Sequence, residues 1–114
     1  MRFLVFLSIL ISVGFPMSNY AATNTFKTAI FAGGCFWCMQ SDFDKVPGVV
    51  KTVVGYTGGT LVNPSYEQVS EGGTGHFEAI EVTYNPKVTN YKKLLNNFWH
   101  NVDPTDANGQ FCDK

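Results

Sequence analysis

The sequence predicts an α+β fold, a two-layer split βαβ (ferredoxin-like) sandwich that is incomplete at its C-terminus. Two observations lead to this prediction. The apolar patterns change along the chain in the order strand, helix, strand, short helix, strand, helix, which is the order of a split βαβ unit. A complete sandwich needs a further strand, yet the sequence stops in a polar loop. With 114 residues, 45% of them hydrophobic, the chain suffices for one domain with a real core.

The first strand and the first helix are expected on either side of a glycine pair. Residues 28–32 are apolar and contain a β-branched isoleucine, which favours a strand. Gly33 and Gly34 then allow a tight turn that a residue with a Cβ would disfavour. Apolar residues at helical spacing follow, namely Cys35, Met39, Phe43 and Val46. A proline and a glycine come next and end this predicted helix.

The middle of the chain is expected to hold a strand, a short helix and a glycine-rich loop. Residues 49–56 are rich in β-branched side chains, which favours a strand. Ser65 and Gln68 have the spacing of a capping box, which predicts a short helix that ends at residue 70. The glycine run at 72–75 lacks the lysine and the spacing of a phosphate-binding loop, so we expect an ordinary loop there.

The last strand and the last helix have the clearest patterns. Residues 76–84 alternate as a strand does, and one face carries His76, Glu78, Ile80, Val82 and Tyr84. Residues 90–102 have the spacing of an amphipathic helix. Its apolar residues are expected in the core rather than in a binding site: Tyr91, Leu94, Leu95, Phe98, Trp99 and Val102.

Residues 1–22 are typical of a secretory signal peptide, and residues 23–114 are expected to form a single domain. Arg2 precedes an apolar run that is too short to span a bilayer, and Ala21 and Ala22 follow as small residues. The residues before the expected cleavage site are not ideal, so an uncleaved anchor is the alternative. We therefore expect a secreted or periplasmic protein, in an oxidising compartment where two of its three cysteines can pair.

The charge of the chain argues against two classes of partner. The formal net charge is −1 at pH 7, and the basic residues do not cluster. Nucleic acid and anionic membrane surfaces are therefore poor candidates. A membrane is expected to matter only through an uncleaved signal peptide.

Cys35 is expected at the first turn of its helix, where unpaired backbone N–H groups and the helix dipole favour an anion. A thiol in that place has more thiolate, so Cys35 is a candidate nucleophile. Two alternatives stay open: Cys35 is a small core residue, or it forms half of a zinc site with Cys38. No second cysteine pair has ligand spacing, and only His76, His100 and Cys112 are available to complete such a site, so no metal is expected.

Residues 33–38 read GGCFWC, and a phenylalanine and a Val-Pro-Gly turn follow them. Further motifs come in order: GYTGG at 55–59, NPSYEQV at 63–69, GHFEA at 75–79, Phe98-Trp99, Asp103-Pro104 and QFCD at 110–113. Together they resemble the A-type peptide methionine sulfoxide reductases over nearly everything after residue 28. The resemblance implies thiol-dependent reduction of the S epimer of methionine sulfoxide, free or in proteins, which repairs oxidative damage.

The resemblance also implies roles for individual residues. Cys35 matches the nucleophile of the family, and Phe36 and Trp37 match the aromatic wall that receives the S-methyl group of the substrate. The polar residues that match the surroundings of the sulfoxide oxygen are Tyr66, Glu78 and Asp113. In that family a glutamate protonates this oxygen. The apolar neighbours of Glu78 on its strand face would favour the neutral carboxyl that this step needs.

Attack by Cys35 would leave a sulfenic acid, which a second thiol converts to a disulfide and an external dithiol reopens. The expected reductant is a thioredoxin-like protein or dithiothreitol, and no bound cofactor is expected. The candidate resolving cysteines are Cys38 and Cys112. We favour Cys38, because residues three apart in a helix have Cα atoms about 5 to 6 Å apart, within disulfide range. Cys112 is the alternative because its neighbour Asp113 matches an active-site position. A monomer is expected.

The chain departs from the family at a few positions. Many members have glycine in place of Cys38 and glutamate in place of Gln40. The family continues after Asp113 with a Gly-x-Gln-Tyr-Arg-Ser stretch, so we expect a C-terminally truncated member. Two other interpretations stay open. One is a thioredoxin-like dithiol-disulfide oxidoreductase, because Cys-x-x-Cys stands at a helix start. The other is an inactive truncated remnant.

Overall fold

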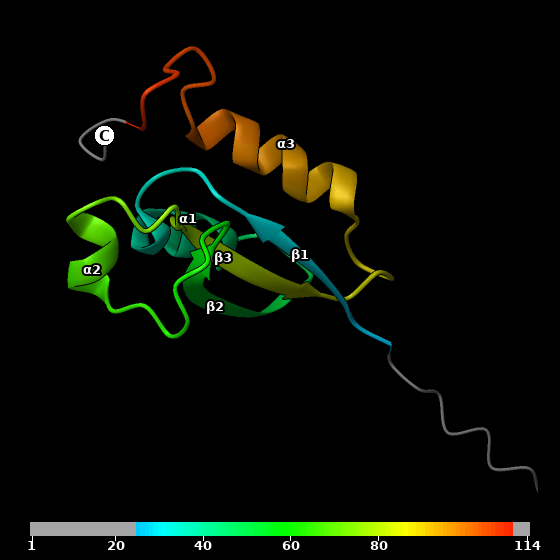
Figure 1. Ribbon diagram of the computed structural model, residues 1–114. Coiled ribbons are helices and arrows are strands. Elements are labelled where there is room, and N and C mark those ends of the chain that lie inside the picture. Colours follow the sequence, from blue (N-terminus) through cyan, green and yellow to red (C-terminus); the bar gives the residue numbers. More distant parts are fainter. Residues whose placement is uncertain (1–24, 111–114) are drawn as a thin grey trace, which may run out of the picture.

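The computed structural model describes residues 25–110 of the 114, and in this part the chain forms three strands and three helices (Figure 1). In chain order they are β1 (Lys27–Phe31), α1 (Phe36–Phe43), β2 (Val49–Thr57), α2 (Tyr66–Ser70), β3 (Phe77–Tyr84) and α3 (Tyr91–Asn101). The predicted order of strands and helices is confirmed. The predicted signal peptide at residues 1–22, together with Cys112 and Asp113, lies outside the described residues.

The sheet has the strand order β1-β3-β2, and both strand pairs are antiparallel. The outer strands β1 and β2 therefore run parallel to each other, with β3 between them. Ile80 of β3 lies opposite Phe31 of β1 and opposite Val54 of β2. Because residues directly opposite each other share a face of the sheet, these three side chains point to the same side.

That face carries the core, and α1 and α3 cover it. Phe43 of α1 and Leu94 of α3 are fully buried together with Ile80 and Val82 of β3. The ring of Phe31 stacks on the ring of Phe43, with 4.8 Å between the centroids. The apolar stripe of each helix thus meets alternate residues of the strands, as the helix and strand periodicities require.

Side-chain caps begin the second and third helices. The Ser65 hydroxyl accepts a hydrogen bond from the Gln68 N–H at 3.2 Å, and the Gln68 side chain accepts one from the Ser65 N–H at 2.8 Å. The predicted capping box is therefore confirmed. In the same way, the Asn90 side chain accepts from the Lys93 N–H at 2.9 Å and starts α3.

The last helix buries less of its apolar stripe than the sequence predicts. Leu94 is fully buried, but Tyr91 and Trp99 are 51% and 52% exposed. The prediction of core positions is wrong for these two aromatic residues. They lie near the two ends of α3, while the core contacts of the helix centre on Leu94. Trp99 instead lines the cleft described below.

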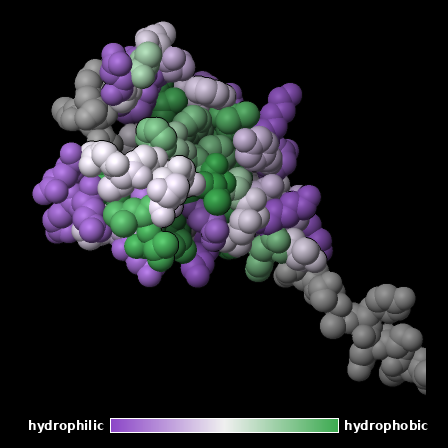
Figure 2. All heavy atoms as spheres, viewed as in Figure 1, coloured by the Kyte–Doolittle hydropathy of each residue, from purple (hydrophilic) through white to green (hydrophobic). Residues whose placement is uncertain are grey.

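The other face of the sheet is not covered by a further strand or helix of the described part of the chain. Ile30, Val53 and Phe77 point to this side and are 61%, 45% and 67% exposed. Figure 2 shows apolar atoms gathered over the strands and hydrophilic atoms over α2. Within residues 25–110, no helix has the length and the apolar character that crossing a membrane requires.

Candidate functional site

A cleft of about 1240 Å³ opens where the chain passes from β1 into α1. Its walls come from the glycine pair, from α1 and α2, from the start of β3, and from the end of α3 with the loop that follows. The predicted site residues that line it are Cys35, Cys38, Tyr66 and Glu78. The fold therefore brings residues from three separate motifs to one cavity.

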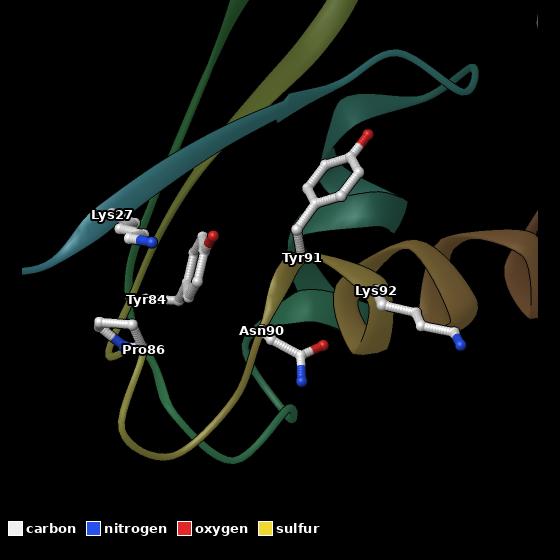
Figure 3. A pocket seen from close by; sticks show the side chains of 6 residues that line it. All are labelled: Lys27, Tyr84, Pro86, Asn90, Tyr91 and Lys92. Carbon is white, nitrogen blue, oxygen red and sulfur yellow. The ribbon is translucent and has the colours of Figure 1, made fainter.

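A smaller pocket of about 520 Å³ lies at the beginning of α3 (Figure 3). It is lined by Lys27, Tyr84, Pro86, Asn90, Tyr91 and Lys92. None of these is a predicted site residue, and none is a cysteine, a histidine or a carboxylate. Of the two cavities, the larger cleft is the candidate site.

Close packing around the glycine pair determines where Cys35 lies. A Cβ added to Gly33 would be 2.6 Å from the ring of Phe98, and one added to Gly34 would be 2.5 Å from Cβ of Gln110. Gly34 also has a φ of +84°, which other residues rarely adopt. Cys35 follows as the half-buried N-cap residue of α1. Its sulfur makes no capping hydrogen bond to the backbone N–H groups of the first turn.

The carboxyl group of Glu78 lies at the first turn of α1. The backbone N–H of Phe36 donates a hydrogen bond to Oε2 of Glu78 at 2.9 Å. This N–H is one of the groups that a helix N-terminus leaves without a partner inside the helix. The bond joins residues 42 positions apart in the sequence, and it holds a half-buried carboxyl group beside the residue that follows Cys35.

The two cysteines of this turn interact directly. Cys38 is exposed, and its backbone N–H donates to the carbonyl of Cys35 at 3.1 Å. The side-chain hydrogen bond with Cys35 raises the pKa of the Cys38 thiol, and the negative charge of an ionised Cys35 raises it further. Cys38 therefore keeps its proton to a higher pH than a free cysteine does. A thiol that holds its proton thus stands one helical turn from Cys35 in the cleft.

Three aromatic rings from the predicted set lie together at the side of the cleft. The ring of Trp37, which is 58% exposed, stacks on the ring of Tyr66 with 5.7 Å between centroids. Phe36 is almost completely buried and lies 6.4 Å from Tyr66. Of these three rings, that of Tyr66 lines the cleft itself. Trp37 extends this aromatic surface into solvent, and Phe36 supports it from the core.

Tyr56 is a residue near the site that the sequence did not predict. It lies directly opposite Glu78 in the pairing of β2 with β3, and its ring is 5.7 Å from that of Phe36. Partial burial raises the pKa of the Tyr56 phenol, and the negative charge of Glu78 adds to the effect. The hydroxyl therefore stays protonated at neutral pH. The strand pattern of residues 49–56 could have located Tyr56 only together with the pairing register.

Residues 25–110 contain no group of three or more histidine, cysteine, aspartate and glutamate side chains that could hold a metal ion. His76, a candidate to complete a zinc site, binds the backbone instead. Its Nδ1 accepts from the Gly59 N–H at 3.2 Å, and its Nε2 lies 2.8 Å from the Leu61 carbonyl. His100 bonds to a carbonyl of its own helix through Nδ1. His76 lines the same cleft as Cys35, but both of its ring nitrogens are engaged by backbone groups, and His100 lies outside the cleft.

Comparison with known proteins places the chain among named relatives. Residues 27–114 match the sequence profile of the family described as "Peptide methionine sulfoxide reductase". The chain is 58% identical over 87 residues to the peptide methionine sulfoxide reductase MsrA of Limosilactobacillus reuteri, which is 76% of this chain and 50% of that protein. It is 50% identical over 110 residues to MsrA 2 of Caulobacter vibrioides, which is 96% of this chain and 56% of that protein.

Two solved structures are similar to the fold. Methionine sulfoxide reductase A of Corynebacterium diphtheriae has a TM-score of 0.75 and 35% identity, over 78% of this chain and 42% of that one. Mxr1 from Saccharomyces cerevisiae in its reduced form has a TM-score of 0.72 and 34% identity, over 78% of this chain and 54% of that one. The chain spans about half the length of the curated relatives named above.

Proposed function

This chain belongs to the peptide methionine sulfoxide reductase family, and we propose that it reduces the S epimer of methionine sulfoxide to methionine. The observation that carries the proposal is the hydrogen bond from the Phe36 N–H to Glu78, which holds a carboxyl group at the residue that follows Cys35, in the cleft that both Cys35 and Glu78 line. A sulfoxide sulfur is a poor electrophile until its oxygen receives a proton. The reaction therefore needs a thiolate and an acid at one place.

In the first step, the Cys35 thiolate attacks the sulfoxide sulfur while the Glu78 carboxyl gives its proton to the sulfoxide oxygen. The Tyr66 hydroxyl donates a hydrogen bond to the same oxygen. The protonated oxygen then passes to the Cys35 sulfur while the new S–S bond and the S–O bond of the substrate break, so the substrate sulfur gains the two electrons that the Cys35 sulfur loses. Methionine leaves, and Cys35 becomes a sulfenic acid that carries the oxygen. Trp37 provides the apolar surface against which the S-methyl group packs, and Phe36 supports this surface from the core.

In the second step, the Cys38 thiol attacks the sulfur of the Cys35 sulfenic acid. A disulfide forms and the oxygen leaves as water. The hydrogen bond between the two thiols supports Cys38 as the resolving cysteine. An external dithiol, such as a thioredoxin-like protein or dithiothreitol, then reduces the disulfide and returns both thiols. No bound cofactor takes part in this sequence of steps. Cys112 is the alternative resolving cysteine, and Asp113 the further polar group near the sulfoxide oxygen.

The proposal also covers the fold type, the oligomeric state and the location of the protein. The parallel outer strands on either side of β3 support a split βαβ unit of the ferredoxin-like kind. Residues 23–114 form the catalytic domain and act as a monomer. The apolar run after Arg2 supports export by a signal peptide at residues 1–22, so the enzyme works in the periplasm or outside the cell.

The test is an assay on the separated sulfoxide epimers with dithiothreitol as reductant, for the wild type and for Cys35→Ser. We expect turnover of the S epimer only, and none with Cys35→Ser. Turnover that survives Cys35→Ser would overturn the mechanism. Insulin-disulfide reduction without sulfoxide reduction would favour the thioredoxin-like alternative. Mass spectrometry after one turnover identifies the disulfide, and a Cys35–Cys112 link would reject Cys38 as the resolving cysteine.

A further inference from the structure

The helix that carries Tyr66 is held by few contacts of its own. α2 has five residues, and none of them is buried. Isolated helices of this length are not stable in water, so the position of α2 depends on the segments at its two ends. Apart from the stacking of Tyr66 on Trp37, these segments determine where the Tyr66 hydroxyl lies in the cleft.

Those two segments meet at His76, which directly precedes β3. The Gly59 N–H, in the loop before α2, donates to Nδ1 of His76 at 3.2 Å. Because Nδ1 accepts a hydrogen bond, the ring proton is on Nε2, which donates to the Leu61 carbonyl at 2.8 Å. The backbone N–H of His76 in turn donates to the Thr74 hydroxyl at 3.1 Å, in the loop after α2. One neutral imidazole thus joins the loop before α2 to the end of the loop after it.

The packing at this junction leaves no room for a side chain at Gly59. A Cβ added to Gly59 would lie 2.5 Å from the His76 ring and 2.6 Å from the Thr74 carbonyl oxygen. A Cβ added to Gly75 would be in ordinary van der Waals contact with Cα of Gly59, at 3.5 Å. The two loops are therefore in contact along their backbones. They close the base of the segment at residues 57–76, which leads from β2 to β3 and which we call the excursion.

We propose that His76 is a positioning residue: its imidazole closes the base of the excursion at residues 57–76 and thereby holds Tyr66 in the cleft. The kinetic consequence rests on the proposed function, because it assumes that Tyr66 binds the sulfoxide oxygen. The closure of the excursion by His76 does not depend on the proposed function. No residue of the excursion belongs to the hydrophobic core, so opening the base moves Tyr66 without unfolding the sheet.

Two substitutions separate the two hydrogen bonds. In His76→Asn the side-chain oxygen takes the place of Nδ1, so the bond from Gly59 is kept and the bond to Leu61 is lost. In His76→Gln the side-chain amide takes the place of Nε2, so the bond to Leu61 is kept and the bond from Gly59 is lost. His100→Asn is the matched control, because His100 is exposed, lies outside the cleft and is the second of the two histidines in the sequence.

The experiment measures tautomer, amide exchange and activity on the full chain. With ¹⁵N-labelled histidine, we expect His76 to show the Nε2–H tautomer. Hydrogen exchange at the Gly59 amide should be about tenfold faster in His76→Gln, and unchanged in His76→Asn and in the control. For the S-sulfoxide, kcat/KM should fall about tenfold in His76→Gln, but by less than about twofold when Tyr66→Phe is already present, because both changes act through one hydroxyl.

Two results would overturn the inference. One is Gly59 exchange in His76→Gln equal to that of the wild type. The other is a full tenfold loss of kcat/KM in the Tyr66→Phe background, which would mean that His76 does not act through Tyr66. If the wild type reduces no sulfoxide, the proposed function fails, and the tautomer and the Gly59 exchange still decide whether His76 closes the excursion.

Discussion

Replacement of Glu78 by glutamine tests the proposed acid while it leaves the local structure intact. In Glu78→Gln the side-chain amide oxygen can still accept the hydrogen bond from the Phe36 N–H, which is 2.9 Å long in the wild type. What disappears is the exchangeable carboxyl proton. A change in activity without a change in stability would therefore report the loss of proton transfer rather than the loss of an anchor for α1.

The expected size of the effect follows from the chemistry. A positioned general acid contributes about 10²- to 10⁴-fold to a rate, which is about 2.7 to 5.5 kcal/mol of transition-state stabilisation. We expect kcat/KM for the S epimer to fall by a factor in this range. The free energy of unfolding should change by less than about 0.5 kcal/mol, because the hydrogen bond to Phe36 is retained. Glu78→Ala also removes that bond and should cost about 1 kcal/mol more in stability.

The assay compares kcat/KM with dithiothreitol as reductant and unfolding in urea for each variant. Glu81→Gln is the matched control, because Glu81 lies on the same strand but on the opposite, exposed face. It should leave both quantities unchanged. If Glu78→Gln retains more than about a third of the wild-type kcat/KM, the side chain does not supply the proton, and the assignment of Glu78 as the acid is wrong.

Three further predictions follow from the same geometry. Alkylation at about pH 8 should label Cys35 before Cys38, because the pKa of the Cys38 thiol is raised and this thiol keeps its proton; peptide mass spectrometry with Cys38 labelled first would contradict this. Trp37→Ala should raise KM about tenfold with little change in kcat, since it removes an exposed ring that stacks on Tyr66; an unchanged KM would exclude Trp37 from the substrate surface. Leu94→Ala should lower the free energy of unfolding, measured by urea denaturation, by about 2 to 5 kcal/mol, because the side chain is fully buried. A loss below about 1 kcal/mol would mean that α3 packs only loosely against the core.

Local rules were enough to predict those parts of the fold in which neighbours in sequence decide the structure. The capping box of Ser65 and Gln68 depends on residues three positions apart, and it forms as expected. The alternation after His76 placed Glu78 on the same side as Ile80, and this side is the core face of β3. Residues at positions 33–38 indicated the turn that presents Cys35, because glycine and a helix start are both local signals.

What the sequence did not predict depends on contacts between distant segments. Tyr56 lies beside Glu78 only because β2 and β3 pair in one register, and a shift by one residue would turn Tyr56 to the other face. Trp99 has the helical spacing of a core residue, but periodicity does not tell how far along α3 the core extends. The sequence pattern indicates a strand residue or a metal ligand at His76. It does not reveal the backbone partner of its Nε2, because this partner belongs to a loop 15 positions earlier.

The first turn of α1 explains how the site can tolerate different side chains at positions 38 and 40. Glu78 is bound to this turn through a backbone N–H, so its position does not depend on which side chains stand at positions 38 and 40. Cys38 is exposed, and the Gln40 side chain bonds to Thr52 on β2, away from the carboxyl of Glu78. A cysteine at position 38 therefore adds a thiol next to Cys35 without disturbing the bond that holds the acid. A substitution at position 38 can therefore change the proposed recycling step without changing the proposed reductive step at Cys35. The reductive step depends on the main chain of the turn, whereas the recycling step depends on the side chain of Cys38.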